Sequence, residues 1–187
     1  MNHYRIMVSL LLVIGLGIPA GASDIQKGIH GMQWGSPISA HEELTRVHEA
    51  NQAAYYANSN MVYQSANQPV PGVFYGFYRD RFFAVFIKLR SPDQFAQLER
   101  QFTTKHGKPK TTYYPETSQT VHRWKNADVK IKLKMKESTR EYKLAIYYEP
   151  LSAKLNREQL ESIPGDAYDK AASKKATAPK SVPLLDD

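Results

Sequence analysis

The chain has 187 residues, a formal net charge of +7 and no cysteine. Its length suits one domain with a well-buried core. The lack of cysteine excludes disulfide bonds, a thiol nucleophile, a thiolate metal site and an acylated N-terminal cysteine. The moderate positive charge points to anionic surroundings, although it is also compatible with an ordinary soluble protein.

Residues 1–22 have the pattern of a cleaved secretory signal peptide. Arg5 precedes the apolar run 6–18, and Pro19 and Ala20-Gly21-Ala22 follow as a small-x-small cleavage site. The run is shorter than the roughly 20 apolar residues that span a bilayer. We therefore expect cleavage after Ala22, no transmembrane segment in the mature chain, and a periplasmic or secreted location. The missing cysteines and glycosylation acceptors favour a bacterial protein.

The segment after a short lead-in over residues 24–35 is predicted to be helical. Ser39 with Glu42 makes a capping-box arrangement, and Ser36 with Pro37 is an alternative start. Four apolar residues recur at roughly helical spacing: Ala40, Leu44, Val47 and Ala50.

Strand patterns dominate the next part of the chain. Residues 53–57 and 61–64 are candidate short strands, and 67–72 has the prolines and glycine of a loop. Val73–Tyr78 and Arg81–Leu89 predict a hairpin that turns at Arg79-Asp80. The second of these strands is apolar on both faces, with Phe83 assigned to one face and Phe82 to the other. Such a strand is normally central and covered on both sides.

The second half of the chain has the clearest signals for where a helix begins and ends. Ser91 is the expected N-cap of a helix, with Pro92 at its first position and Gly107 as its stop. Strands are then predicted over 120–125, 129–136 and 141–148, and a last helix over 152–162. Residues 164–187 are rich in Ala, Lys, Ser and Pro, which favours a disordered tail.

The order of these elements predicts the fold class α+β, as a single domain over residues 23–163. The expected architecture is an antiparallel sheet with helices packed mainly on one face. Tyr78-Arg79-Asp80 and Trp124-Lys125-Asn126 precede similar apolar alternations, so two related helix-plus-hairpin halves are one alternative and chance similarity is the other.

Several short motifs within residues 28–150 carry a resemblance. They are Gly31-Met32-Gln33-Trp34-Gly35, Tyr75-Gly76-Phe77-Tyr78, His106-Gly107-Lys108-Pro109 and Trp124. With the expected capped helix, they make the chain resemble an uncharacterised group of exported bacterial α+β domains. The resemblance implies a fold and an exported location, and no catalytic residue.

Strand 129–136 supplies the main candidate for a functional surface, because apolar residues and lysines alternate along it strictly. With neighbouring strands paired to it, one sheet face would carry Arg123, Lys125, Lys130, Lys132, Lys134, Lys136 and Lys143. Such a face suits phosphates or carboxylates of lipopolysaccharide, phospholipid, wall polymer or an acidic protein. Alternatively, the lysines only solvate the sheet and protect its edge from pairing, and the nearby Glu137, Glu141 and Glu149 weaken the patch.

Two other groups of residues are weaker candidates. His41 and His48 lie seven residues apart, which on a helix is too far for one metal ion, so solvated histidines are expected. Seven aromatic residues would either line a glycan or lipid groove or pack in the core: Tyr55, Tyr56, Tyr63, Phe74, Tyr75, Phe77 and Tyr78.

Known catalytic patterns are missing from the sequence. It has no G-x-S-x-G elbow and no P-loop. We therefore predict no catalytic residue, no cofactor and no metal site, and we do not expect nucleic acid as a partner of an exported protein. The leading functional hypothesis is an exported, non-enzymatic envelope binding or interaction module. The alternatives are a small hydrolase-like enzyme with an unrecognised site and a structural assembly subunit.

Overall fold

The computed structural model describes residues 24–50, 52–155 and 178–185. The predicted signal peptide, its cleavage site and most of the predicted last helix lie outside these residues. Within the described part of the chain, no helix is long and apolar enough to cross a membrane.

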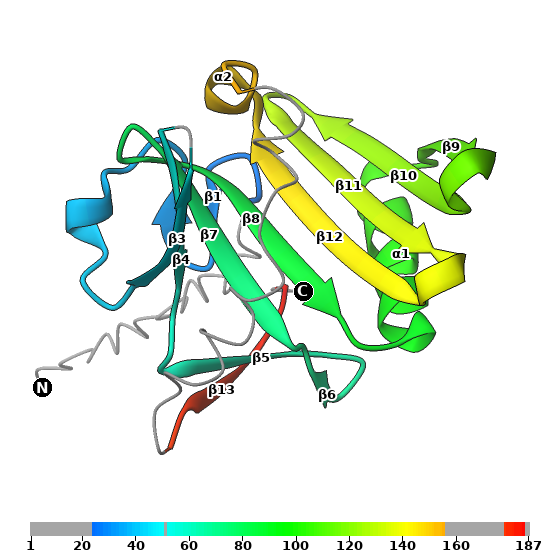
Figure 1. The fold of residues 1–187 in the computed structure, drawn as a ribbon, viewed down its shortest axis with the longest axis horizontal. Coiled ribbons are helices and arrows are strands. Elements are labelled where there is room, and N and C mark those ends of the chain that lie inside the picture. The colour runs from blue at the N-terminus through cyan, green and yellow to red at the C-terminus, as the bar shows by residue number, and fades with distance from the viewer. Residues whose placement is uncertain (1–23, 51, 156–177, 186–187) are drawn as a thin grey trace, which may run out of the picture.

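Strands form most of the described structure (Figure 1). Their bounds are β1 Gly28–Ile29, β2 Met32–Gln33, β3 Thr45–Ala50, β4 Ala53–Ala57, β5 Met61–Ser65, β6 Gln68–Pro69, β7 Gly72–Tyr78, β8 Arg81–Leu89, β9 Lys110–Tyr114, β10 Gln119–Asn126, β11 Val129–Lys136, β12 Glu141–Tyr148 and β13 Lys180–Pro183. The α-helices are α1 Pro92–His106 and α2 Glu149–Ser152, and 3₁₀ turns span Ile38–Ala40, Pro115–Thr117 and Glu137–Thr139.

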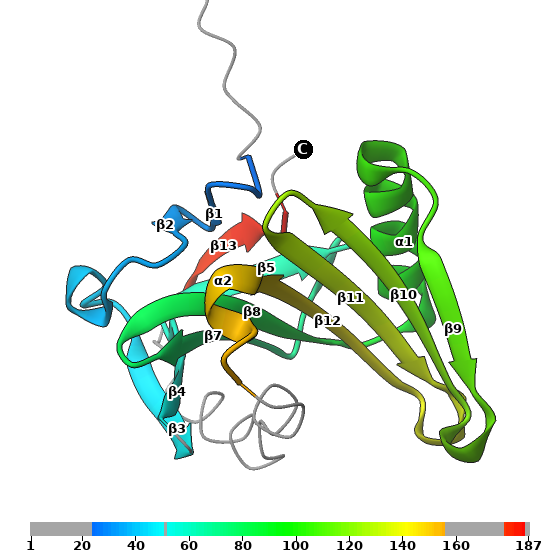
Figure 2. The same cartoon turned by 90° about the horizontal axis from the view of Figure 1, so that it is seen from above.

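The main sheet is antiparallel and has eight strands in the order β3-β4-β7-β8-β12-β11-β10-β9. The sheet is strongly curved, and α1 lies on the same side of it as β5 and β13 (Figure 2). The strands β13-β5-β6 form a second sheet, and β1 pairs only with β2. One face of the main sheet is therefore covered by a helix at one end and by short strands at the other.

The predicted α+β class is wrong, because the fold is β-rich. Among the described residues, only α1 is a helix of several turns, and it covers only part of the sheet face. The predicted first helix is replaced by the 3₁₀ turn Ile38–Ala40 and by β3. Strand pairing of β3 with β4 outweighs the weak helical pattern there, which is the usual way in which tertiary context overrides local propensity. Without that helix, the alternative of two helix-plus-hairpin halves is also wrong.

Several predictions for the second half of the chain are confirmed, although the sequence does not predict β9. Ser91 caps α1 by accepting a hydrogen bond from the backbone N–H of Gln94, and Gly107 ends the helix with a φ of +80°. The predicted strands 129–136 and 141–148 coincide with β11 and β12. Two predictions near the C-terminus are wrong. The predicted last helix does not start at Ser152, because α2 ends there and residues 153–155 are not helical. Residues 180–183 of the expected disordered tail form β13 and pair with β5.

Strand β8 is central and buried on both faces, as predicted. Its residues from Phe82 to Ile87 are 0–7% exposed, and they contribute to both hydrophobic clusters of the core. A β-bulge changes the predicted assignment of its faces. Gly76 pairs with Ala84 and Phe77 pairs with Phe82, so Phe83 is the extra residue. Phe82 consequently lies in the cluster under α1, and Phe83 lies in the cluster on the opposite face.

Gly76 on β7 makes room for this bulge. A Cβ atom at position 76 would lie 2.9 Å from Cε1 of Phe83 and 3.1 Å from a ring carbon of Phe86. These distances are shorter than ordinary carbon contacts, so any larger residue displaces two buried rings from their packing.

We expect Gly76→Ala to lower the free energy of unfolding by about 1–3 kcal/mol, the usual cost of overpacking a core. Chemical denaturation measures the loss. Phe83→Leu in both backgrounds is the matched test, since a smaller side chain at position 83 should relieve part of the strain in the alanine variant. An unchanged denaturation midpoint for Gly76→Ala would show that the rings are not held as described.

Candidate functional site

The strand register brings the seven predicted cations onto one face of the main sheet. Lys130 lies opposite Lys125, Lys132 lies opposite Arg123, and Lys134 lies opposite Lys143. Residues that lie opposite each other in paired strands point to the same side of a sheet. The lysine-bearing side of β11 is therefore continuous with β10 and β12, and we call this surface the basic face.

Two further lysines join the basic face from strands that sequence reasoning did not connect with it. Lys110 of β9 lies opposite Arg123, and Lys88 of β8 lies opposite Lys143. The alternation pattern of β11 reveals its own lysines, but the contributions of β8 and β9 depend on strand order. No local signal in the sequence contains that order.

The cations form two rows across the sheet. One row consists of Lys110, Arg123 and Lys132, and the other consists of Lys134, Lys143 and Lys88. Cβ atoms of directly opposite residues are about 4.5–5.5 Å apart, and like charges in such pairs are destabilising. Two adjacent rows of like charge place a strong positive potential on this part of the sheet.

Arg123 is held in a fixed position within its row. Its Nη1 donates a hydrogen bond of 2.9 Å to Oγ1 of Thr112, and its Nη2 donates one of 2.8 Å to the hydroxyl of Tyr114. The guanidinium carbon also lies 5.9 Å from the centre of the Tyr114 ring. Neutral groups thus orient Arg123 without cancelling its charge.

Two glutamates offset part of the positive charge of the basic face. Glu149 contacts Lys125 at 2.9 Å and also pairs with Lys130, while Glu141 lies 3.2 Å from Lys143. Hydrogen bonds from Lys130 and then from Lys125 hold the pKa of the Glu149 carboxyl below its usual value. The predicted weakening by acidic neighbours is therefore present on the basic face, and one of these ion pairs involves Lys143, the central member of the second row.

The basic face adjoins the second hydrophobic cluster of the core on the same side of the sheet. Lys132 marks the boundary, because its Nζ lies 5.0 Å from the ring centre of Tyr147, which is 2% exposed. Beyond it are buried residues of β4, β7, β8 and β12: Ala53, Tyr55, Ala57, Phe74, Phe83, Ala84, Phe86 and Ala145. The side of the sheet thus changes from apolar to cationic over the width of two strands.

Most of the aromatic residues considered for a groove belong to the core. Tyr55, Tyr63, Phe74, Tyr75 and Phe77 are all less than 9% exposed. Burial raises the pKa of Tyr55 to about 12 and that of Tyr75 well above its usual value. These phenols are therefore neutral at physiological pH and unsuited to acid–base chemistry there.

The histidines do not converge on a common site. Nε2 of His41 is within hydrogen-bond distance of the Ser36 hydroxyl, and His48 of β3 stacks on Tyr55. In the described ranges, no group of three or more His, Cys, Asp or Glu residues is placed to hold a metal ion.

A buried polar chain that sequence reasoning missed joins three distant segments. Nε2 of His30 donates to the backbone carbonyl of Leu184 at 2.7 Å, because a carbonyl can only accept. In the neutral ring, Nδ1 then accepts from the hydroxyl of Tyr75 at 2.9 Å, and that hydroxyl also bonds to the hydroxyl of Tyr63. The residues are 12, 45 and 154 positions apart, so no motif could have indicated the contact.

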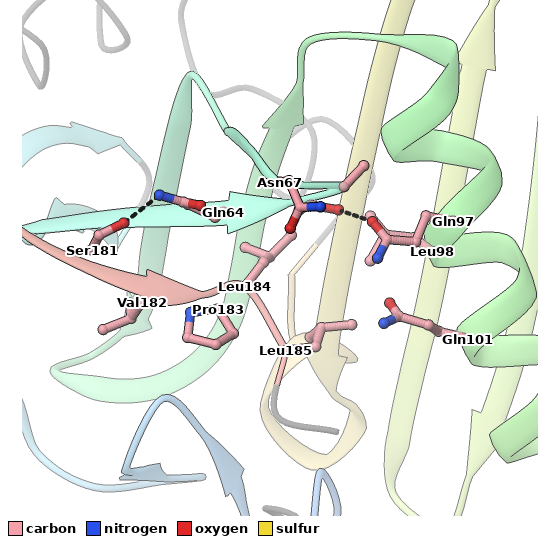
Figure 3. A pocket seen from close by; sticks show the side chains of 12 residues that line it. Gln64, Asn67, Gln97, Leu98, Gln101, Ser181, Val182, Pro183, Leu184 and Leu185 are labelled. Carbon is pink, nitrogen blue, oxygen red and sulfur yellow. Dashed lines mark hydrogen bonds between the residues drawn. The ribbon is translucent and has the colours of Figure 1, made fainter.

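A pocket of about 330 Å³ lies between α1 and the end of the C-terminal segment (Figure 3). Gln97 and Gln101 of α1 and Gln64 of β5 supply amide groups, and Leu184 and Leu185 supply an apolar wall. None of the described residues that line this pocket is charged.

Comparison with known proteins gives no relative to which these features can be related. No protein-family model, no curated protein and no solved structure matches the chain.

The Glu149 ion pairs give a pH-dependent prediction. Because the pKa of Glu149 is lowered in the folded state, its stabilising effect is present above the usual pKa of a glutamate and is lost as pH falls through the lowered value. NMR titration of the side-chain carboxyl should show that lowered pKa, and Lys130→Gln should raise it further than Lys27→Gln does. A Glu149 pKa that is the same in all three proteins would show that the pairs do not form.

Proposed function

We propose that this protein is an exported, non-enzymatic binding module of the bacterial envelope that contacts an anionic partner through its basic face. The proposal of export rests on the signal-peptide pattern of residues 1–22. The proposal of anion binding rests on the two rows of opposed cations on β8–β12.

The two rows of cations support anion binding because the solvation of a sheet face does not by itself require like charges to lie opposite each other. A solvated sheet face is equally well served by alternating charges, which attract each other across strands, whereas opposed like charges repel. An anion placed between the rows offsets that repulsion and is contacted from two sides. The oriented guanidinium of Arg123 adds a planar donor pair suited to phosphate or carboxylate oxygens.

The described surface supports binding more than catalysis. The basic face is built from strands of the main sheet, and none of the described residues that line the amide-rich pocket beside α1 is titratable. A hydrolase-like site needs convergent polar groups with shifted pKa values in a concave site. Tyr55 and Tyr75, whose pKa values are raised by burial, lie in the core.

Binding to vesicles over a salt series tests the proposal. The mature chain should bind vesicles containing phosphatidylglycerol, and lipopolysaccharide, more tightly than phosphatidylcholine vesicles at low salt. Changing Lys130, Lys132, Lys134 and Lys136 together to Gln should weaken that binding at least tenfold, since each lysine near an anionic surface contributes about 1 kcal/mol.

A variant with the same net charge provides the control. It carries four lysine-to-glutamine changes at exposed residues outside the basic face: Lys27, Lys105, Lys108 and Lys180. We expect this variant to keep most of the affinity of the wild type. If both variants lose the same affinity, net charge and not the basic face explains the binding. If the wild type binds no anionic surface, the proposal is refuted.

Removing one of the offsetting carboxylates should have the opposite effect. Glu149→Gln releases Lys125 and Lys130 from their ion pairs and adds one positive charge to the face. We expect tighter binding to phosphatidylglycerol vesicles and a steeper dependence on salt concentration, measured by co-sedimentation. Glu116→Gln on the turn after β9 makes the same charge change outside these ion pairs, and affinity gains of equal size would argue against a local effect.

A further inference from the structure

The C-terminal strand β13 lies outside the main sheet and pairs in parallel with β5. The backbone N–H of Lys180 donates to the carbonyl of Asn60, and that of Leu184 donates to the carbonyl of Gln64, both at 2.7 Å. The side chains of Gln64 and Ser181 are also hydrogen-bonded (Figure 3). Residues 180–184 are thus bound as an extended peptide along the free edge of β5.

A single residue anchors this segment in the core. Leu184 is 1% exposed and belongs to the cluster under α1, and its carbonyl is the acceptor of the bond from His30. His30 stacks on Tyr63 at 4.4 Å and is bonded to Tyr75. The groove beside β5 therefore binds a leucine side chain and one backbone carbonyl. A second copy of the chain carries the same segment and supplies both groups.

The other side chains of the segment are less buried than that of Leu184. Lys180, Ser181 and Pro183 are exposed and Val182 is half-buried. The pocket of Figure 3 remains between the segment and α1, so the groove is only partly filled. An element with one buried anchor and an exposed backbone ladder belongs to the least stable part of a fold.

The connection to β13 is long enough for the segment to reach a neighbouring molecule. The 24 residues 156–179 separate Leu155 from Lys180. At most they span about 80 Å, at roughly 3.3 Å per residue. Loop-closure entropy changes only slowly with such lengths, so docking in a second molecule costs little in the connection itself.

Prolines restrict how the three-stranded sheet can pair with another molecule. Pro183 in β13 and Pro69 in β6 lie on its two outer strands. The backbone bonds of Lys180 and Leu184 direct even-numbered positions of β13 toward β5, so the ring nitrogen of Pro183 faces outward. A strand added outside β13 would find no N–H donor there. Exchange of β13 itself is the mode of pairing that remains open at this edge.

We propose that the groove beside β5 accepts the C-terminal segment of a second copy of this chain, so that two copies exchange β13. Each groove then makes the same contacts with Leu184 and with the backbone that it makes within one molecule. The internal segment competes at an effective concentration in the millimolar range, so exchange should become appreciable at protein concentrations of about 1 mM. This inference is independent of the basic face.

Trapping by disulfide formation tests the exchange, and the cysteine-free chain makes the result unambiguous. Ser181 lies opposite Val62 in the parallel pair, at a strand separation that a disulfide can bridge. A Val62→Cys protein and a Ser181→Cys protein of different mass are mixed at about 1 mM and mildly oxidised. We expect a disulfide-linked heterodimer at least ten times more abundant than in a mixture of Glu116→Cys with Ser181→Cys.

Two further variants make the outcome decisive. Adding Leu184→Ser to the Ser181→Cys chain removes the anchor, and heterodimer formation should fall to the level of the Glu116→Cys control. The double variant with Val62→Cys and Ser181→Cys in one dilute chain should close its disulfide internally and remain monomeric. If the double variant forms its internal disulfide but the mixture gives no excess heterodimer, the exchange of β13 is overturned. If the double variant does not form the disulfide, the pairing of β13 with β5 is overturned.

Discussion

The packing around the central strand β8 is the constraint on which the rest of this fold depends. Its residues are buried on both faces, so the sheet must be covered twice or be shielded by its own curvature. The bulge places Phe83 in the same cluster as its neighbour Ala84, and Gly76 supplies the space for the ring of Phe83. A bulge also increases local twist, which agrees with the strong curvature of the sheet.

The two sides of the main sheet differ in the chemistry of the side chains that they carry. Under α1 and the three-stranded sheet, large apolar residues from β7 to β12 form one continuous cluster. On the other side, the apolar cluster extends to Tyr147, and lysines and an arginine occupy β10 and β11 beyond it. We propose that this cationic surface, which adjoins a buried aromatic cluster, serves the recognition of anions.

The two contacts with other molecules that we propose involve separate parts of the fold. The basic face would act through charge and depend on salt, whereas the groove beside β5 would act through one leucine and a backbone ladder. The buried chain from Tyr63 to His30 shows why the second site escapes notice in a sequence. It fixes a backbone carbonyl, and backbone groups leave no residue pattern.

The sequence by itself determined the elements with strong local signals. Capping fixes both ends of α1, and strict alternation defines β11 and its lysines, because these signals involve residues only a few positions apart. Tertiary structure decided the fold class, the strand order that adds Lys88 and Lys110 to the basic face, and the pairing of the C-terminal segment. It also turned the predicted first helix into β3 and reversed the faces of Phe82 and Phe83, since the pairing of β3 with β4 and the bulge between β7 and β8 depend on how adjacent strands pack in the sheet and not on local propensity alone.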